Sequence, residues 1–307
     1  MRLDQLRFFI SAAECGSISE AARRVHLAQP AFSAHIKALE QDLGVVLFER
    51  SARGVSLTAS GQRLFEGALA LMRHVDQVRH EAVTAGPELS GDVRIVLASS
   101  LAPVLSGHIF ALTRQTYPHI RLTILDLLRV AGENLVTSRL VDFGLLPNAS
   151  TLSGAASQAV LAQDLYLVGR SLPGITSSAV PFNQLHHFPL VMGGRKNQLR
   201  IDLENTAARE GQRLNVVAEQ DSLSVYRSII MAGEYYTVVP YSAYAVEIET
   251  GRLMAAKIVE PVVERTTSFV WHEFSELSAA ASAVRDLTRQ CITRLVELGH
   301  LRGRLLT

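Results

Sequence analysis

AQPAFSAHIKALEQDLGVVLFER, residues 28–50, is the stretch that decides the fold of the N-terminal part of the chain. It predicts a helix that begins at Gln29 and Pro30, because proline is tolerated in the first turn, and that ends near Leu43, before Gly44. Apolar residues at helical spacing predict its buried face: Phe32, Ile36, Leu39 and Leu43. The opposite face carries short or flexible side chains that are free to contact a partner: Gln29, Ser33, Ala34 and Lys37.

Two shorter helices are expected before this one, and a hairpin after it. The expected elements are helices over 3–13 and 20–25 and strands at 46–48 and 55–57. Gly16 is placed to end the first helix, and Ser17 or Ser19 to cap the second. The turn at 50–54 contains two arginines. Three short helices followed by a basic hairpin are typical of a winged helix-turn-helix, although an ordinary small helical subdomain explains the periodicity equally well.

A long helix is predicted next, from Thr58 to about Ala85. Its apolar residues recur at alternating steps of four and three, as in a coiled-coil seam: Leu64, Ala68, Leu71, Val75, Val78 and Ala82. A helix of this length with one apolar seam is not stable alone in water, so we expect self-association through it. The alternative is that the seam packs on the globular part of the same chain.

Beyond a break at 86–91, strands alternate with helices, which is typical of a parallel α/β sheet. The first expected elements are strands at 93–98, 120–128 and 143–146 and helices at 109–116 and 135–140. Residues 120–147 and 214–240 share one pattern of strand, polar break, helix and short strand ending in proline, which indicates two similar lobes. The strand at 268–271 and the helix at 279–298 are expected to return to the first lobe. Two crossings would create a hinged cleft, with ligands at the carboxyl ends of the strands.

Composition limits the class of protein. The chain has 307 residues, 48% of them hydrophobic and 19% charged, enough for two or more cores. No apolar run approaches the roughly 18 residues of a membrane span, and charged residues interrupt the N-terminus, so we expect neither a signal peptide nor a membrane partner. Cys15 and Cys291 form no paired motif, which favours a reducing cytoplasm. The net charge of +1 says nothing for nucleic acid, so a DNA prediction must rest on pattern.

Nothing in the sequence predicts catalysis. The chain lacks a GxSxG nucleophile elbow, an HExxH zinc motif and a phosphate-binding loop. Its ten histidines are scattered, and His186 and His187, although adjacent, would point apart in a strand. We therefore predict no catalytic residue, no metal site and no cofactor.

The run at 28–50, the basic turn SARG and the segment LTASG together resemble the DNA-binding segment of LysR-type transcriptional regulators. The order of helix, hinge and two-lobed domain resembles that family along essentially the whole chain, and residues 163–169 with MGGRKNQLRID are similar to its nitrogen-assimilation-control-like branch. The resemblance implies an α/β fold with a winged helix-turn-helix DNA-binding domain, a long linker (dimerisation) helix with a hinge, and a two-lobed, periplasmic-binding-protein-like effector domain. The implied boundaries are 1–58, 59–90 and 91–307, with lobe I at about 91–162 and 268–307 and lobe II at about 163–267.

The resemblance also implies a DNA-binding surface. It places Gln29, Pro30, Ala31 and Ser33 against bases and phosphates in the major groove, and Arg50 and Arg53 in the wing near the backbone. Glutamine can pair bidentately with adenine, which agrees with this placement. Ala28 stands where many members have a capping serine, and Ala34 where many have arginine. The missing arginine gives His35 and Lys37 more weight as contacts.

Effector contacts are predicted after the strands of both lobes. Ser99 and Ser100 can hold a carboxylate with hydroxyl and backbone N–H groups, unless they only cap the next helix. Arg129, near a helix N-terminus, is predicted as the anion anchor; the alternative is a structural pair with Asp126 or Glu133. The positions that the resemblance places at the cleft are Asn148, Gly193, Gly194 and Tyr235. Glycine is frequent in the family where Tyr235 stands, so the ring would narrow or close the cleft.

The sequence therefore predicts a cytoplasmic, ligand-responsive transcriptional regulator and not an enzyme. The expected partners are double-stranded DNA bearing an interrupted inverted repeat, a small anionic effector, further copies of the chain in a dimer and then a homotetramer, and RNA polymerase. Two alternatives remain open at this point: an effector-independent DNA-binding regulator, and a solute-binding protein. The missing signal sequence and the helix-turn-helix argue against a solute-binding protein.

Overall fold

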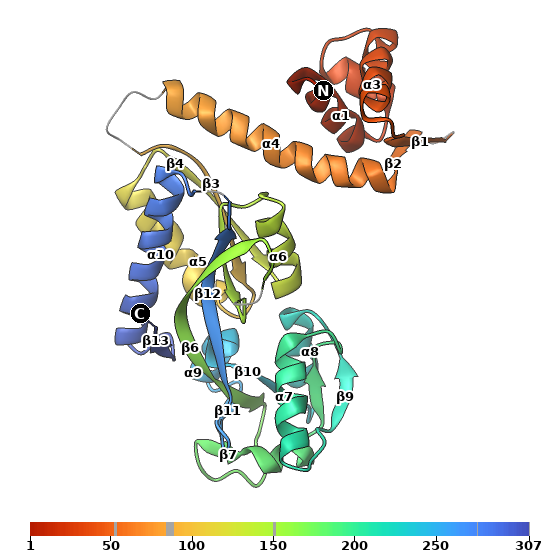
Figure 1. The fold of residues 1–307 in the computed structure, drawn as a ribbon. Coiled ribbons are helices and arrows are strands. Elements are labelled where there is room, and N and C mark those ends of the chain that lie inside the picture. Colours follow the sequence, from red (N-terminus) through yellow and green to blue (C-terminus); the bar gives the residue numbers. More distant parts are fainter. Residues whose placement is uncertain (52–53, 84–88, 150–151, 275, 307) are drawn as a thin grey trace. The chain divides into compact units, whose positions relative to one another are not determined.

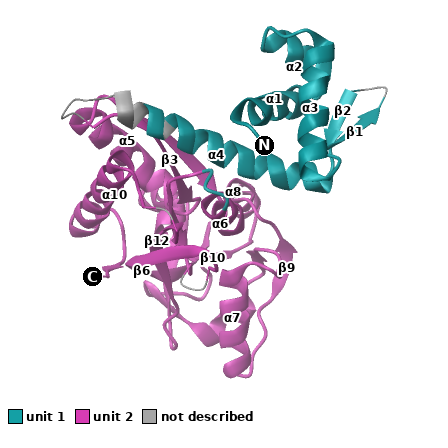
Figure 2. Cartoon of the chain, turned by 45° about the horizontal axis from the view of Figure 1, so that its top comes forward, with its two compact units in different colours: residues 1–87, 138–140 teal, residues 88–137, 141–307 magenta. Residues whose placement is uncertain are grey.

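The computed structural model describes residues 1–51, 54–83, 89–149, 152–274 and 276–306. The chain divides into two compact units, and each is described by itself. Unit 1 consists of residues 1–87 and 138–140, and unit 2 of residues 88–137 and 141–307 (Figure 2). Within the described ranges, no helix is both long enough and apolar enough to cross a membrane.

Unit 1 contains three short helices, a hairpin and one long helix (Figure 1). In chain order they are α1 Leu3–Cys15, α2 Ile18–Arg24, α3 Gln29–Leu43, β1 Phe48–Ser51, β2 Gly54–Leu57 and α4 Ala59–Val83. The predicted helix ends are confirmed: Gly16 and Gly44 take left-handed conformations, with φ of 60° and 67°, after α1 and α3. Ser17 caps α2 by accepting a hydrogen bond from the N–H of Glu20 at 3.4 Å. This order is that of a winged helix-turn-helix.

Two details of the helix-turn-helix prediction are wrong. Leu43 is 38% exposed, so the buried face of α3 ends one turn earlier, at Leu39. The first strand begins at Phe48 instead of Val46, because the Glu40 carboxylate accepts hydrogen bonds from the N–H groups of Leu47 and Phe48, at 2.8 and 3.3 Å. Glu40 thus ties the end of α3 to the start of the wing.

The apolar seam of α4 is divided. Leu64 and Ala68 pack with Phe65 against the core of the three short helices, as the alternative interpretation predicts for this part. Leu71 and Val78, further along the seam, are 39% and 51% exposed within the single chain. At Leu71 and Val78 the seam therefore remains exposed in the single chain.

Unit 2 begins with a parallel β-sheet covered by helices on both faces (Figure 1). The elements of this part, lobe I, are β3 Gly91–Ala98, α5 Ala102–Thr116, β4 Ile120–Leu127, α6 Arg129–Thr137, β5 Phe143–Pro147, the C-terminal helix α10 Ala279–Glu297 and β13 Arg304–Leu305. Alternate residues of β3 face opposite sides: Ile95 and Leu97 join the core under α5 and α10, and Val96 joins the core under α6. The helix α10 thus returns to lobe I, as predicted.

Lobe II repeats the strand–helix–strand order on a smaller scale. Its elements are β7 Ala179–Pro181, the 3₁₀ helix η1 Phe182–His187, β8 Leu190–Met192, α7 Gln198–Arg209, β9 Val216–Glu219, α8 Leu223–Ala232, β10 Thr237–Pro240, the 3₁₀ helix η2 Tyr241–Tyr244, α9 Ala245–Glu249 and β11 Met254–Val259. The three successive elements β4, α6 and β5 in lobe I have the same order as β9, α8 and β10 in lobe II. This confirms the internal repeat that the sequence predicts.

Two long strands connect the lobes: β6 Ala155–Gly169 and β12 Glu264–His272. They pair antiparallel along β12, with Arg265 opposite Gln163, and β6 then pairs with β10 and β11 from Leu165 to Gly169. The two strands therefore form the crossings, and the sequence prediction, which starts the second strand at residue 268, is too late by four residues. The four residues of β12 that the prediction leaves out, 264–267, lie between the lobes.

Candidate functional site

The exposed end of α3 is the candidate DNA-binding surface. Gln29, Pro30 and Ala31 are exposed, and Gln29 Nε2 donates a hydrogen bond to the Ser33 hydroxyl at 3.2 Å. Ala28 occupies the N-cap position without a side-chain hydrogen bond, so no hydroxyl or carboxylate of the cap competes for the backbone N–H groups there. Such a helix end attracts phosphate through its free N–H groups and its dipole.

The remaining predicted contacts differ in character. Lys37 is exposed, and Arg50 is exposed on β1, opposite Val55 in the hairpin. The ring of His35 is half-buried, with its centroid 5.0 Å from that of Phe8, so this residue packs α3 on α1 as well as bordering the surface. Arg53 lies outside the described residues.

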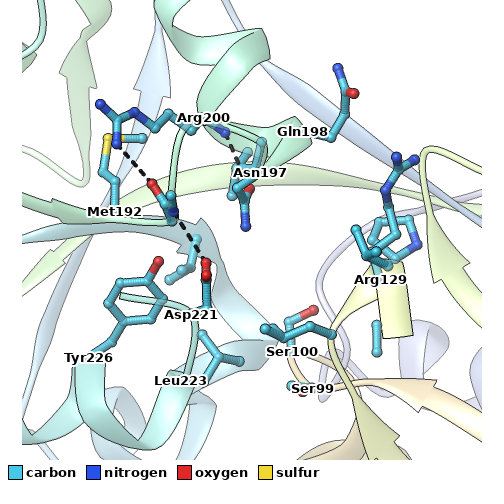
Figure 3. A pocket seen from close by; sticks show the side chains of 18 of the residues that line it. Ser99, Ser100, Arg129, Met192, Asn197, Gln198, Arg200, Asp221, Leu223 and Tyr226 are labelled. Atoms are coloured by element: carbon cyan, nitrogen blue, oxygen red, sulfur yellow. Dashed lines mark hydrogen bonds between the residues drawn. The ribbon is translucent and has the colours of Figure 1, made fainter. Parts of the chain in front are cut away.

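The second candidate site is a cavity of about 640 Å³ between the lobes of unit 2. The carboxyl ends of β3, β4, β5, β8 and β10 all reach it, as expected for an α/β sheet. Six of the seven predicted effector residues line the cavity: Ser99, Ser100, Arg129, Asn148, Gly193 and Gly194. Figure 3 shows Ser99, Ser100 and Arg129 on one side of it and Asp221, Leu223 and Tyr226 on another.

Tyr235 is the exception, and the prediction that its ring narrows the cleft is wrong. It is 43% exposed and is not part of the wall. The cavity is lined by β10 itself, from Thr237 to Pro240, whereas Tyr235 stands in the segment before this strand.

The two serines do not cap a helix. The N-cap of α5 is Leu101, which makes no side-chain hydrogen bond, so the capping alternative is wrong. Ser100 is buried, and its hydroxyl accepts a hydrogen bond from Nη2 of Arg265 at 2.7 Å. Ser99 is half-buried, and its N–H bonds to the carbonyl of Leu127 at 3.3 Å.

Arg129 forms the ion pair that was the alternative to an anion anchor. Its Nη1 lies 3.1 Å from the Glu133 carboxylate, one turn along α6, and also donates to the carbonyl of Asn148 at 2.9 Å. Burial raises the pKa of Glu133, and the positive charge of Arg129 acts against this rise. Much of the charge of Arg129 is therefore balanced within the chain.

Asn148 links the two lobes across the cavity. It takes a left-handed conformation, with φ of 50°, after β5, and its Nδ2 donates to the carboxylate of Asp202 on α7 at 3.0 Å. Gln198 holds the other oxygen of the same carboxylate at 2.8 Å. Asn148 therefore serves as a bridge between the lobes.

Arg265 is the most unusual residue of the cavity, and the sequence analysis missed it. It is 7% exposed and lies on the crossing strand β12, where Nη2 donates to Ser100 and, at 3.2 Å, to the side-chain carbonyl of Gln163. Within the described part of the chain no carboxylate pairs with it, and its Nε has no hydrogen-bond partner. Burial lowers the pKa of Arg265 to about 10, which leaves the guanidinium charged at neutral pH.

Charged side chains that the sequence did not predict hold the backbone of the lobe II wall in place. Nη1 of the buried Arg200 donates to the carbonyl of Gly193 at 3.0 Å and to Glu219 at 2.7 Å. The N–H of Gly194 donates to the carboxylate of Asp221 at 3.2 Å. A side chain at Gly193 would come within 2.5 Å of Asn197, so glycine is required there for steric reasons. Both glycines contact the cavity, but the carbonyl of Gly193 and the N–H of Gly194 already have partners.

Two protein-family models together match most of the chain. Residues 86–291 match the LysR substrate binding domain, and residues 3–62 match the bacterial regulatory helix-turn-helix protein of the lysR family. The first match corresponds to the two-lobed unit with the cavity, and the second to the three helices and the wing.

Whole-length relatives support the same assignment. The transcriptional regulator YfeR of Shigella flexneri is 29% identical over 94% of this chain and 93% of its own length. The nitrogen assimilation regulatory protein Nac of Escherichia coli is 27% identical over 95% and 96%. Among solved structures, a full-length OxyR variant of Pseudomonas aeruginosa superposes with a TM-score of 0.69 at 20% identity, over 95% of this chain and 94% of its own. The matched domains, their order and the full-length coverage lead to one conclusion: this chain belongs to the LysR family of DNA-binding transcriptional regulators.

Proposed function

We propose that this regulator binds an inverted-repeat operator as a dimer or tetramer and that a small anionic effector in the lobe cleft controls this binding. Arg265 is the observation that carries the proposal, because a buried guanidinium that no carboxylate of the described residues pairs with is costly unless an anion completes its site. The protein acts in the cytoplasm and contacts RNA polymerase at its promoters. It has no enzymatic activity, and it belongs to the nitrogen-assimilation-control-like branch of the family.

DNA recognition is assigned to the N-terminal end of α3. The hydrogen bond from Gln29 to Ser33 fixes the glutamine amide over the first turn of the helix, where base edges in a major groove are read. A bidentate contact of this amide with adenine contributes about 1–3 kcal/mol of discrimination against other bases. Pro30, Ala31, Ser33 and Lys37 complete the surface, His35 borders it, and Arg50 and Arg53 contact the backbone from the wing.

Assembly is assigned to the uncovered half of the α4 seam. Leu71 and Val78 are one heptad apart and exposed, so two copies of α4 can bury them against each other. Such a dimer presents two α3 helices to one interrupted inverted repeat, because the symmetry of the protein is matched by that of the operator. Pairing of two dimers through unit 2 gives the tetramer.

Effector binding is assigned to the cavity around Arg265 and Ser100. A volume of about 640 Å³ suits a metabolite of ordinary size. Ser99, Arg129, Asn148, Gly193 and Gly194 form the surrounding wall, with Arg129 and Gly194 partly satisfied by the chain itself.

A thermal-shift panel tests the effector proposal. The full-length protein and its Arg265→Gln variant are heated with acetate, 4-methylpentanoate, 3-phenylpropanoate, L-leucine, phosphate and sulfate. An effector at 100 times its dissociation constant stabilises the folded protein by about 2.7 kcal/mol, so a shift of a few degrees is expected in the wild type and not in the variant. Equal shifts in both proteins, or none in either, would contradict the proposal and favour an effector-independent regulator.

A further inference from the structure

Among the described residues, one buried charge at the cavity wall is left without a counter-charge. Arg129 pairs with Glu133 at 3.1 Å. The buried Arg200 lies 2.7 Å from the carboxylate of Glu219 and 2.8 Å from a second carboxylate, one turn along α7. No carboxylate of the described ranges balances Arg265 in this way, although its side chain is 7% exposed.

The other charged residues of the wall are exposed: Arg195, Lys196 and Asp221. Water screens charges of either sign at such positions, so all three add little to the affinity for a charged ligand. Once the paired and the exposed groups are set aside, the positive charge of Arg265 remains. A ligand that balances it needs one negative charge.

Gln163, on the neighbouring crossing strand β6, orients this guanidinium without neutralising it. The glutamine is fully buried, and its Nε2 donates to the backbone carbonyl of Arg302 at 3.3 Å and to the hydroxyl of Ser242 at 3.2 Å. A carbonyl only accepts hydrogen bonds, so the amide oxygen of Gln163 must face Arg265, whose Nη2 donates to it at 3.2 Å. A glutamate at this position would place a carboxylate against the guanidinium instead.

Two donors remain for an anion at this place. Nη2 of Arg265 is shared between Gln163 and Ser100, and Nε has no accessible surface. Nη1 has no hydrogen-bond partner within the described part of the chain and, unlike Nε, is not sealed from the surface. The second donor is the hydroxyl of Ser100, whose oxygen accepts from Arg265 at 2.7 Å, which leaves its proton for a ligand. Each of these donors can bind one oxygen of a carboxylate.

Apolar side chains from both lobes form much of the remaining wall: Leu127, Leu128, Met192, Leu199 and Leu223. A second anionic group among them would lose its hydration without gaining a buried, unbalanced cation. An apolar body, in contrast, gains free energy when it leaves water for such a wall.

We infer that the effector is a monocarboxylate with an apolar body, held by Arg265 and Ser100, and that Gln163 keeps the charge of Arg265 available for it. This inference rests on the proposed function and specifies the effector class. The carboxylate completes the guanidinium, and the body occupies the apolar part of the cavity. Dicarboxylates and phosphate bring more negative charge than the buried wall balances. In this account Gln163 is a positioning residue, because it acts through Arg265.

The test compares ligands that differ by one group. Dissociation constants of the full-length protein are measured by titration calorimetry for 4-methylpentanoate, for 2-methylglutarate, in which a carboxylate replaces one methyl group, and for the uncharged 4-methylpentanamide. An aromatic set consists of 3-phenylpropanoate, 3-(4-carboxyphenyl)propanoate and 3-phenylpropanamide. L-Leucine adds an ammonium group beside the carboxylate of the first acid, and acetate, phosphate and sulfate lack the apolar body.

Two variants remove the proposed anchor in different ways. Arg265→Gln deletes the charge, whereas Gln163→Glu keeps the arginine and balances it with a carboxylate of nearly the same shape. Gln290→Glu makes the same change at an exposed position of α10, away from the cavity wall.

In the wild type, at least one of the two monocarboxylates should bind about tenfold or more tightly than its dicarboxylate and its amide, since an unbalanced buried charge of either sign is costly. The same acid should bind more tightly than acetate, because it buries an apolar body. Arg265→Gln and Gln163→Glu should both lose the preference for the acid over the amide, and Gln290→Glu should keep it.

A dicarboxylate, L-leucine, acetate or an inorganic anion that binds as tightly as the monocarboxylates would overturn the inference and leave the proposed anionic effector intact. A preference for the acid over the amide that survives in Gln163→Glu or in Arg265→Gln would also overturn it. Amides that bind as tightly as the acids, or no binding by any of these compounds, would refute the inference and the proposed function together.

Discussion

Gln29 is held at the start of α3 by a hydrogen bond to Ser33, so its amide has one prearranged position on the exposed end of the helix. The Gln29→Ala variant should lose about 1–3 kcal/mol of affinity for the operator selected by the wild-type protein, and it should lose little for unrelated duplexes. Fluorescence anisotropy with both duplexes measures the difference. Equal losses on both would exclude Gln29 from base recognition.

Arg50 should behave differently, because an exposed arginine on the wing contacts phosphate and carries no sequence information. The Arg50→Ala variant should weaken binding to every duplex by a similar factor and reduce the slope of log K against log salt by about 0.9. The same anisotropy assay over a range of salt concentrations checks this. A sequence-dependent loss would show that Arg50 reads bases.

The ion pair between Arg129 and Glu133 gives a prediction on stability and pH. In Arg129→Ala the buried carboxylate of Glu133 loses its cation, which should cost about 1–3 kcal/mol at neutral pH. Because burial raises the pKa of this carboxyl in the folded state, the cost is largest above that pKa and falls as acid protonates the group. Urea denaturation at pH 7 and pH 5 measures it, and Glu133→Gln in the same background should restore stability. A cost independent of pH would mean that Arg129 stabilises the fold by other means.

Single residues also show where sequence reasoning is sufficient. Ser99, Ser100 and Arg129 could be placed at the cavity because residues that follow parallel strands meet at one edge of a sheet. Arg265 could not be placed at the cavity from the sequence. It is buried because the strands β6 and β12 pair where they cross between the lobes, and the apolar residues that mark β12 in the sequence come only after Arg265. Tyr235 was misplaced because its distance from the cavity depends on where β10 begins, which the local sequence does not determine.

At the scale of whole elements, the apolar seam of α4 differs in exposure along its length. The spacing of apolar residues predicts the seam correctly. It does not show whether the same chain or another copy of the protein covers these residues. Leu64 and Ala68 are covered within unit 1, whereas Leu71 and Val78 are exposed. The structure shows which residues unit 1 covers, and a second copy as the cover of Leu71 and Val78 is our proposal.

A charge in the exposed half should therefore separate the dimer. Leu71→Glu places a carboxylate in the proposed interface, where burial without a partner costs several kcal/mol, on the order of 2–7. Analytical ultracentrifugation should show a smaller oligomer, together with weaker operator binding. Asp76→Lys changes the charge on the opposite side of the same helix and should leave the oligomer intact. An unchanged oligomer in Leu71→Glu would place the interface elsewhere.

At the scale of the molecule, the alternation of strands and helices and the internal repeat were enough to predict two lobes with two crossings. The polar links between the lobes were not predictable, because Asn148 meets Asp202 and Arg265 meets Ser100 over long separations in the chain. In the proposed function, a ligand in the cavity acts on the arrangement of the lobes through these links. A ligand changes DNA binding only through its different affinities for the two arrangements, and the coupling is reciprocal.

The most direct test of control by the cleft is the operator affinity of the full-length protein with and without ligand. The selected duplex is titrated with wild-type protein and with Arg265→Gln, each alone and with saturating amounts of the compound from the thermal-shift panel that stabilises the wild type most. The account predicts a change of about 5- to 150-fold in the wild-type dissociation constant, in either direction, and no change in Arg265→Gln, whose affinity without ligand stays at the wild-type value. An equal change in both proteins, or an unchanged wild-type constant at saturation, would contradict it.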